Sequence, residues 1–318
     1  MSEIRMARRA MKRNKVKLSK SEKAFDIFNV IFMILLCIIM IYPFWYVLVL
    51  ALNTGTDAIR GPIWFWPRKF TLDNFEIVLR YPGLHKAALV TIARCFIGPL
   101  INVLVCLFAA FALSKRFLRG RKGIIFFLMG PMFIGGTVVS NYIVMAKMGF
   151  LNNFLVYVIP GAFGYFTAVI MRSFIDGIPQ ELQESAMLDG ASYTTIFFQI
   201  ILPLCKPCIA AFLFFSVVGN WLDMNTTLLY ITKQNLYTLQ YIMHLVLSST
   251  EAKTIINATT SQNAQQQMAA IQNARSAAPT PQVIKMAIIV VVTFPILFIY
   301  PFFQRYFIKG MLTGAVKA

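Results

Sequence analysis

The sequence predicts an all-α integral membrane protein with six transmembrane helices and both termini in the cytoplasm. Of its 318 residues, 58% are hydrophobic and 13% are charged, whereas about 25% of the residues in an ordinary soluble domain are charged. Mean hydropathy is +0.68, and lysine and arginine gather in a few segments between long apolar runs. This composition excludes a soluble globular domain, a disordered chain and a small secreted domain held by disulfides.

Six apolar segments are long enough to cross a bilayer, which requires about 20 residues in a helix. Backbone groups in lipid must be paired within the segment, and none of the six has the strand-type alternation of a barrel, so we expect helices. The first segment does not fit a cleavable signal peptide, because its apolar stretch is too long and no small-residue cleavage site follows Trp45. The predicted spans are residues 27–51, 87–113, 123–146, 153–174, 207–230 and 283–307.

The positions of lysine and arginine predict the orientation of these spans. A basic N-terminal segment, residues 1–26, precedes the six-helix domain of residues 27–318, and a second basic cluster follows the second span. Because basic loops stay in the cytoplasm, both termini and loop 175–206 are expected there. The net charge of +18 is therefore an insertion signal, and no nucleic-acid binding is expected. The two clusters contain Arg5, Arg8, Arg9, Lys12, Arg13, Lys15, Lys17, Lys20 and Lys23, and then Lys115, Arg116, Arg119, Arg121 and Lys122.

Two loops are expected on the outer side. Loop 52–86 carries Trp64, Trp66 and Tyr81, and aromatic side chains favour the membrane–water interface, along which this loop is expected to lie. Loop 231–282 is long and contains a tract rich in Gln, Asn and Ala. Loops of this length are usually functional or disordered, so this loop is either a cap that contacts an external protein or a solvated insertion.

The five cysteines are not expected to form disulfides, because all of them lie in spans or at the cytoplasmic face. Cys205 and Cys208 have the spacing of a redox or zinc site. A zinc site would need two further ligands, and the two histidines, His85 and His244, are predicted on the opposite side of the membrane. No metal site is expected.

The cytoplasmic loop 175–206 is predicted to form a helix–turn–helix. Pro179 suits the first position of a helix, and Gly190 suits the left-handed stop that ends one. A second helix is expected to begin near Ser192 and to end before Pro203. Composition alone leaves two readings open: an amphipathic hairpin that joins two spans, or a surface on which small residues let another protein approach closely.

The spacing within this loop closely resembles the EAA loop of ABC importer permeases. That family pattern is E-A-A, three residues, G, nine residues and I-x-L-P, and this chain departs from it only in having Ser185 in place of alanine. In such importers the short helix of the loop docks into a groove on a cytoplasmic ATPase and transmits its closing motion to the spans. The resemblance assigns ATPase coupling to Glu184, Ser185, Ala186, Asp189, Gly190, Ile200, Leu202 and Pro203.

The resemblance implies a type I ABC importer permease fold in a multi-pass protein of a bacterial cytoplasmic membrane. It also implies three protein partners: a dimer of ABC ATPases, a second and different permease subunit, and an extracellular sugar-binding lipoprotein. A phosphate-binding loop needs a Gly-Lys dipeptide, which is absent from the sequence. The chain is therefore predicted to be no enzyme and to bind no cofactor, while a partner subunit uses ATP.

Wider similarity points to the carbohydrate-uptake permeases of the maltose type, and within them to a subgroup that imports complex oligosaccharides or polysaccharides. On this resemblance the substrate is an oligosaccharide or a polysaccharide fragment. The segments that carry the similarity are residues 133–136, 149–153, 238–243 and 304–317.

Polar and aromatic residues within the spans are candidates for the sugar pathway, because sugars are bound by aromatic faces and by amides and carboxylates. Arg94 is expected either to snorkel or to pair with a partner subunit, and Asp223 either lines the pathway or anchors the helix at the outer interface. The candidates are Asn220, Trp221, Asp223 and Asn225 in the fifth span, Ser140, Asn141 and Tyr142 in the third, and Asn102 beside Arg94 in the second.

Three other functions remain as alternatives. A permease for an amino acid, a peptide or phosphate would also carry an EAA loop. A stand-alone channel would have no use for an ATPase-docking loop. An intramembrane enzyme would need a catalytic cluster such as H-E-x-x-H, which the sequence lacks.

Overall fold

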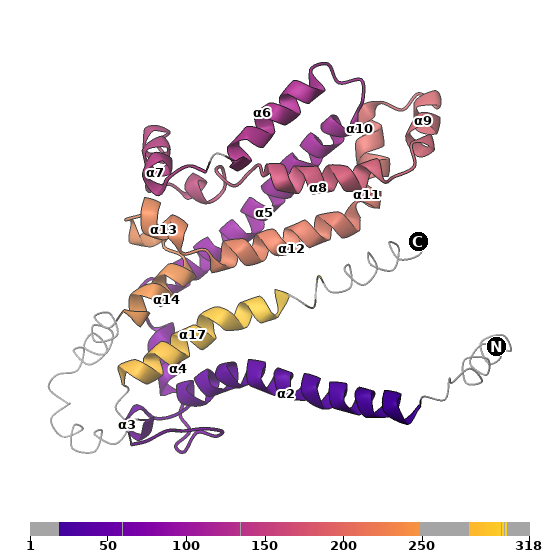
Figure 1. Cartoon of the computed structure of the whole chain (residues 1–318). Helices are drawn as coiled ribbons and strands as arrows, with labels where there is room; N and C mark the ends of the chain where they lie inside the picture. The colour runs from indigo at the N-terminus through magenta and orange to yellow at the C-terminus, as the bar shows by residue number, and fades with distance from the viewer. Residues whose placement is uncertain are drawn as a thin grey trace.

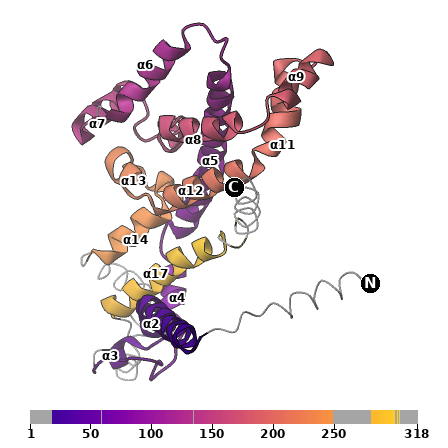
Figure 2. The ribbon, with the colours of Figure 1, turned by 45° about the vertical axis from the view of Figure 1, so that its right-hand side comes forward.

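The computed structural model describes residues 19–58, 60–133, 135–248, 280–299, 301 and 303, and this part of the chain is helical without a β-strand. The N-terminal basic segment up to residue 18, most of the long outer loop and the tail from residue 304 lie outside the described residues, as do the predictions made for them. Figures 1 and 2 show an elongated arrangement in which α9 and α3 occupy opposite ends.

Helix α2 (Lys20–Ala51) forms the first predicted span and begins earlier than expected. Ser19 caps it: its hydroxyl accepts a hydrogen bond from the Glu22 N–H, and the Glu22 carboxylate accepts one from the Ser19 N–H. Such a capping box satisfies N–H groups that a helix start leaves unpaired. The polar residues before position 27 therefore extend the helix beyond the apolar run.

The loop between α2 and α5, which is the first predicted outer loop, folds back onto the end of α2. It contains α3 (Gly55–Ala58) and α4 (Asp73–Leu79), and the Trp45 indole of α2 donates a hydrogen bond to the Phe65 carbonyl at 2.9 Å. The fully buried Asn53 donates to the Asp57 carboxylate at 3.1 Å. This loop is an ordered part of the fold.

Helix α5 (Leu84–Ser114), the second predicted span, is the central element (Figure 1). It packs against α8 (Tyr165–Asp176) and α12 (Lys206–Leu222), and α17 (Pro281–Leu297) packs against α2. One buried cluster surrounds the C-terminal half of α5, and a second joins its N-terminal half to α14 (Leu239–Leu247) and α17. One continuous helix thus connects both halves of the core.

The third and fourth predicted spans are not continuous helices, which corrects the expectation for residues 123–146 and 153–174. The third is broken into α6 (Arg121–Phe133) and α7 (Val138–Lys147), and the hydroxyl of Thr137 caps α7 by accepting from the Ser140 N–H at 3.2 Å. The break between α6 and α7 falls at the Gly135-Gly136 pair, because glycine destabilises the interior of a helix. In the fourth, a 3₁₀ turn (η1, Phe154–Tyr157) precedes α8 across Pro160-Gly161.

The fifth predicted span, residues 207–230, is also interrupted. Helix α12 ends at Leu222, and a short helix α13 (Asn225–Tyr230) follows Asp223. A 3₁₀ turn, η3 (Gln234–Leu236), then leads into α14. The sixth span, predicted over 283–307, corresponds to α17 and reaches beyond the fully described residues.

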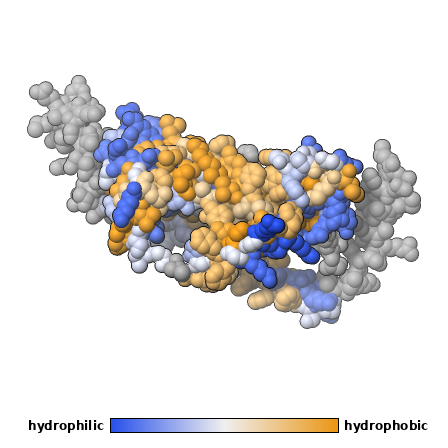
Figure 3. Space-filling view, turned by 90° about the horizontal axis from the view of Figure 1, so that it is seen from above, coloured by the Kyte–Doolittle hydropathy of each residue, from blue (hydrophilic) through white to orange (hydrophobic). Residues whose placement is uncertain are grey.

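Apolar helices give the described part of the chain the character of a membrane protein. By length and composition α2 and α5 can each cross a bilayer, and two bent helix pairs add up to two more spans, while α17 is apolar but shorter. Figure 3 shows a broad hydrophobic surface in the middle of the molecule with hydrophilic residues toward both ends. Such a band is the surface that the hydrocarbon core of a bilayer requires.

Candidate functional site

The coupling segment, residues 175–206, begins with the short helix α9 (Glu181–Leu188). Gln180 occupies the N-cap, so Pro179 precedes the helix rather than forming its first turn, which corrects the expected start. Glu181 and Glu184 lie in the first turn, where the positive end of the helix dipole stabilises negatively charged side chains. At the other end of α9 the apolar side chain of Leu188 is 90% exposed.

Gly190 ends this helix as the sequence predicts. Its φ of +83° is left-handed, and its N–H donates to the Met187 carbonyl at 3.0 Å while the Ala191 N–H donates to the Ala186 carbonyl at 2.9 Å. This pair of bonds is a Schellman motif, which satisfies carbonyls left free at a helix end. A side chain at position 190 would meet open space within this chain.

The second helix of the segment begins as predicted and continues further. Ser192 caps α10 (Tyr193–Ile196) by accepting from the Thr195 N–H at 3.2 Å. A π-helical turn, η2 (Phe197–Ile201), and the short α11 (Leu202–Leu204) then carry the chain past Pro203. Pro203 is tolerated because it lies at the start of α11, where no N–H is needed. Between α11 and α12 the axis bends by 74°.

The eight residues assigned to coupling fall into two groups. Ala186, Ile200 and Leu202 pack against the buried cluster around the C-terminal half of α5. The exposed members are Glu184, Ser185, Asp189, Gly190 and Pro203. The segment therefore has one face attached to the helical body and another face free for a partner.

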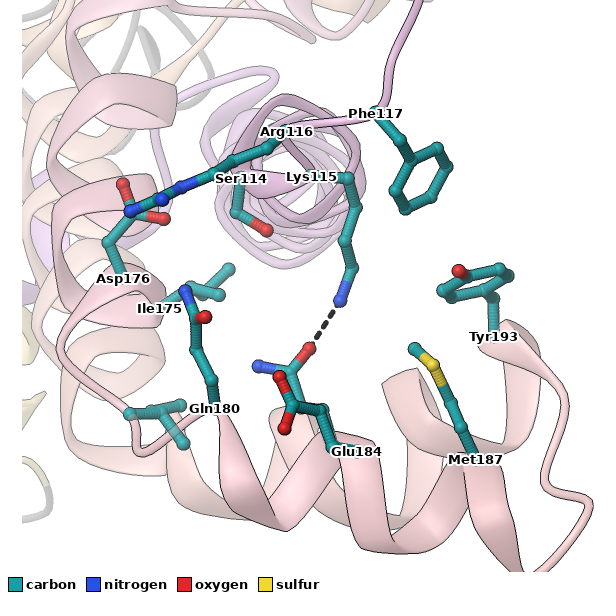
Figure 4. A pocket seen from close by; sticks show the side chains of 12 residues that line it. Ser114, Lys115, Arg116, Phe117, Ile175, Asp176, Gln180, Glu184, Met187 and Tyr193 are labelled. Carbon is teal, nitrogen blue, oxygen red and sulfur yellow. Dashed lines mark hydrogen bonds between the residues drawn. The ribbon is translucent and has the colours of Figure 1, made fainter.

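A cavity of about 240 Å³ lies between the end of α5 and the coupling segment. Lys115 points across it from the end of α5 and donates a hydrogen bond to the Gln183 side chain of α9 (Figure 4). Its ammonium also lies 4.4 Å from the ring centroid of Phe111 and 5.6 Å from that of Tyr193. Burial lowers the pKa of Lys115 from its ordinary value. Neither Lys115 nor Gln183 was singled out as a site residue from the sequence, because a lysine in a basic loop is indistinguishable from a topology signal.

The Cys205-x-x-Cys208 pair belongs to the core. Both thiols are buried, and burial raises the pKa of Cys205 to about 12. Burial therefore disfavours the thiolate form on which the reactivity of a cysteine depends. Among the described residues no group of His, Cys, Asp or Glu side chains has the arrangement of a metal site.

Arg94 of α5 pairs with Asp223 at the break between α12 and α13. The guanidinium of Arg94 donates to a carboxylate oxygen of Asp223 at 2.5 Å and to its backbone carbonyl at 3.2 Å. The side chain of Arg94 is 3% exposed and that of Asp223 is 25% exposed. Arg94 therefore forms its ion pair within the chain. The expectation that it snorkels or pairs with a partner subunit is corrected.

A polar network surrounds this ion pair. The Arg94 guanidinium carbon lies 4.6 Å from the ring centroid of Tyr157, and the Tyr157 hydroxyl donates to the Leu236 carbonyl at 2.8 Å and lies 2.9 Å from the Thr227 hydroxyl. Thr91, one turn before Arg94, accepts the Leu239 N–H at 2.9 Å. The N-terminal half of α5 thus anchors α13 and α14.

The other candidates in the fifth span have different surroundings. Trp221 is buried and donates to the Val292 carbonyl of α17 at 3.1 Å, and it also lines a cavity with Ile92 and Phe96 of α5. Its place in the sugar pathway stays a prediction. Asn220 is half-buried and donates to the Ser216 carbonyl of its own helix at 2.8 Å. Asn225, the first residue of α13, is exposed.

The candidates in the third span stand together at the start of α7. Ser140 is hydrogen-bonded to Thr137 at the cap, while Asn141 lies against Gly136, where a side chain would come within 2.7 Å of its amide oxygen. Tyr142 is 42% exposed and stacks on Tyr230 of α13 with 6.1 Å between ring centroids. Asn102 of α5 is instead tied to the Gly161 carbonyl at 2.8 Å.

Comparison with known proteins gives close relatives over nearly the whole chain, although no family model matches it. Protein LplC of Bacillus subtilis is 33% identical over 299 residues, which cover 94% of this chain and 97% of LplC. The polygalacturonan/rhamnogalacturonan transport system permease protein YtcP of the same species is 30% identical over 296 residues, covering 93% and 99%. A bacterial ABC transporter involved in the import of the acidic polysaccharide alginate matches with a TM-score of 0.79 at 21% identity, over 92% of this chain and 100% of that chain.

The described part of the chain is helical and largely apolar, and its fold is that of the solved importer. The similarity to LplC and YtcP extends over both chains almost completely. The chain belongs to the permease-subunit family of carbohydrate ABC importers, which confirms the resemblance found in the sequence. Its relatives are permease components rather than enzymes, as predicted.

Proposed function

We propose that the chain imports an oligosaccharide or polysaccharide fragment together with a cytoplasmic ABC ATPase dimer, a second and different permease subunit and an extracellular sugar-binding lipoprotein. The observation that carries this proposal is the coupling segment. It combines the family spacing with an exposed face that includes Gly190 and ends in the exposed Leu188. ATP is used by the partner, and this chain binds no cofactor.

The proposed topology is six membrane crossings with both termini in the cytoplasm of a bacterial cell. Helices α2 and α5 and the two bent pairs would supply up to four crossings, and α8 and α17 the remaining two. This assignment brings α9 and the basic cluster after α5 to the same side, which agrees with the preference of basic loops for the cytoplasm.

For the substrate route we propose residues at the start of α7, at the end of α12 and at the start of α13: Asn141, Tyr142, Asn220, Asp223 and Asn225. Tyr142 and Tyr230 present a stacked aromatic pair, and such rings pack against the apolar faces of sugars. YtcP is named for polygalacturonan and rhamnogalacturonan, and the solved importer for alginate. Fragments of plant or acidic polysaccharides are therefore the first substrates to test.

The test is reconstitution of the full chain with its co-purifying partners into proteoliposomes. We expect ATP-dependent uptake of labelled oligogalacturonides or rhamnogalacturonan fragments in the presence of the sugar-binding protein. Uptake only of amino acids, peptides or phosphate would contradict the proposed substrate. Flux that does not depend on ATP would contradict the importer and favour a channel.

Replacing Tyr142 with alanine should raise the sugar concentration for half-maximal uptake about two- to twelvefold, because one aromatic stacking contact contributes about 0.5–1.5 kcal/mol. Tyr142→Phe keeps the ring and should stay near the wild-type value. The matched control is Phe126→Ala, which removes a ring that is 74% exposed on α6. Equal effects at positions 126 and 142 in an uptake assay would remove Tyr142 from the pathway.

A further inference from the structure

Helix α9 touches the helical body through an unusual contact. Gln183 is the residue of α9 that is buried, at 9% exposure, whereas the rest of the helix is exposed or half-buried. A buried polar side chain needs a hydrogen-bond partner, because leaving it unpaired costs free energy. Its partner is the Lys115 ammonium at the end of α5.

Lys115 is held at the junction of three elements. Its stem leaves the end of α5, its ammonium lies over the Phe111 ring of the same helix, and Tyr193 of α10 approaches it from the other side of the cavity (Figure 4). Cations are attracted to aromatic faces, most strongly where water is excluded. The other charged groups around the cavity are Arg116, Asp176 and Glu184, so the ammonium is surrounded by charge of both signs.

Because Lys115 lies at the end of α5, this contact connects α9 to the whole length of that helix. Helix α5 is continuous from Leu84 to Ser114, and at 1.5 Å per residue Arg94 lies about 30 Å along the helix from Lys115. At that distance Arg94 holds the break in the fifth span through Asp223. A displacement of α9 that pulls on Lys115 therefore acts on the helix that anchors the outer side.

We propose that Lys115 is a positioning residue that fastens the coupling segment to α5, so that motion of a docked ATPase is passed to this helix. The inference rests on the proposed function and deepens it. It does not place Lys115 in contact with either ATP or sugar. Loss of the Lys115–Gln183 contact should separate ATP hydrolysis from transport while the complex remains assembled.

The experiment uses the complete complex in proteoliposomes and measures sugar molecules imported per ATP hydrolysed. Lys115→Met keeps an apolar stem of similar length but removes the charge and the donor. We expect the ratio to fall about tenfold, the factor that corresponds to loss of one hydrogen bond to a charged group. Lys115→Arg keeps a positive charge and a hydrogen-bond donor at this position. Its ratio should therefore stay within about twofold of the wild-type ratio, a change of less than about 1.4 kcal/mol.

Two further variants separate this role from a loss of folding. Lys122→Met removes an exposed charge from the same basic cluster, at the start of α6, and should leave the ratio unchanged. Gln183→Leu should lower the ratio as Lys115→Met does, and combining the two should lower it no further, because both remove the same contact. Gln183→Leu also decides the matter if Lys115→Met fails to fold.

The outcomes distinguish the inference from the function on which it rests. A complex without any ATPase would overturn the proposed function itself. An intact complex in which Lys115→Met or Gln183→Leu keeps the wild-type ratio would overturn the role of Lys115 alone. Failure of Lys115→Arg to recover more transport than Lys115→Met would overturn it as well, because shape rather than charge would then matter.

Discussion

Replacing Gly190 with leucine is expected to abolish ATP-driven uptake while leaving membrane insertion and helix content intact. Gly190 has a φ of +83°, a conformation that costs a residue with a side chain roughly 1–2 kcal/mol. A folded domain is stable by about 5–15 kcal/mol, so this strain alone does not unfold the protein. The added side chain meets open space within the chain and would instead occupy the surface proposed to dock the ATPase.

Gly83 provides the matched control for this variant. Its φ is +89°, and a side chain there would also meet nothing within 4 Å, but it stands at the start of α5, at the end of that helix remote from Lys115. Gly83→Leu therefore imposes similar strain without touching the coupling segment, and it should retain most of the uptake. Circular dichroism and uptake in membrane vesicles measure the two properties separately. Normal uptake by Gly190→Leu would count against docking at this turn.

The second large effect is expected at the outer ion pair. Asp223→Asn should destabilise the protein by about 3–5 kcal/mol, because it leaves the buried guanidinium of Arg94 without a counter-charge. The asparagine oxygen still accepts the hydrogen bond that Asp223 receives from the Thr226 N–H at 3.3 Å, so this local contact with α13 is kept. Thermal unfolding of the purified protein in mild detergent is the measurement.

A double variant tests whether charge is the cause. Arg94→Met with Asp223→Asn removes both charges, and exchange of a buried ion pair for uncharged side chains is often neutral. We expect the double variant to recover most of the stability lost in Asp223→Asn. Equal destabilisation of both would show that the packing at this site, rather than the unpaired charge, determines stability.

Some helices and helix ends could be predicted from the sequence, because residues close together in the chain determine them. The apolar runs located α2 and α5, and Gly190 and Ser192 marked the end of one short helix and the start of the next. These features depend on residues close together in the chain. The Gly135-Gly136 break and the interruption at Asp223 were missed because hydropathy averages over short polar or flexible sites.

Contacts between distant residues were not predictable in this way. Arg94 and Asp223 are 129 residues apart, and nothing near either position specifies the other. Trp221 resembled a sugar-binding aromatic residue, yet tertiary packing buries it against α17. From the sequence, Lys115 is only one of several basic residues that predict the orientation of the spans. Its contacts with Gln183 and Tyr193 exist because α9 and α10 approach the end of α5.

Photocrosslinking from the tip of α9 tests directly whether the coupling segment docks a cytoplasmic ATPase. Leu188→benzoylphenylalanine in the full-length chain places a reactive group at a side chain that is 90% exposed beside Gly190. Irradiation of intact membranes should yield an adduct with a protein that contains a G-x-x-x-x-G-K-[ST] phosphate-binding loop. The same group introduced as Trp66→benzoylphenylalanine, in the first outer loop, should yield no such adduct. Absence of the ATPase from the Leu188 adducts, or equal capture from position 66, would contradict the account.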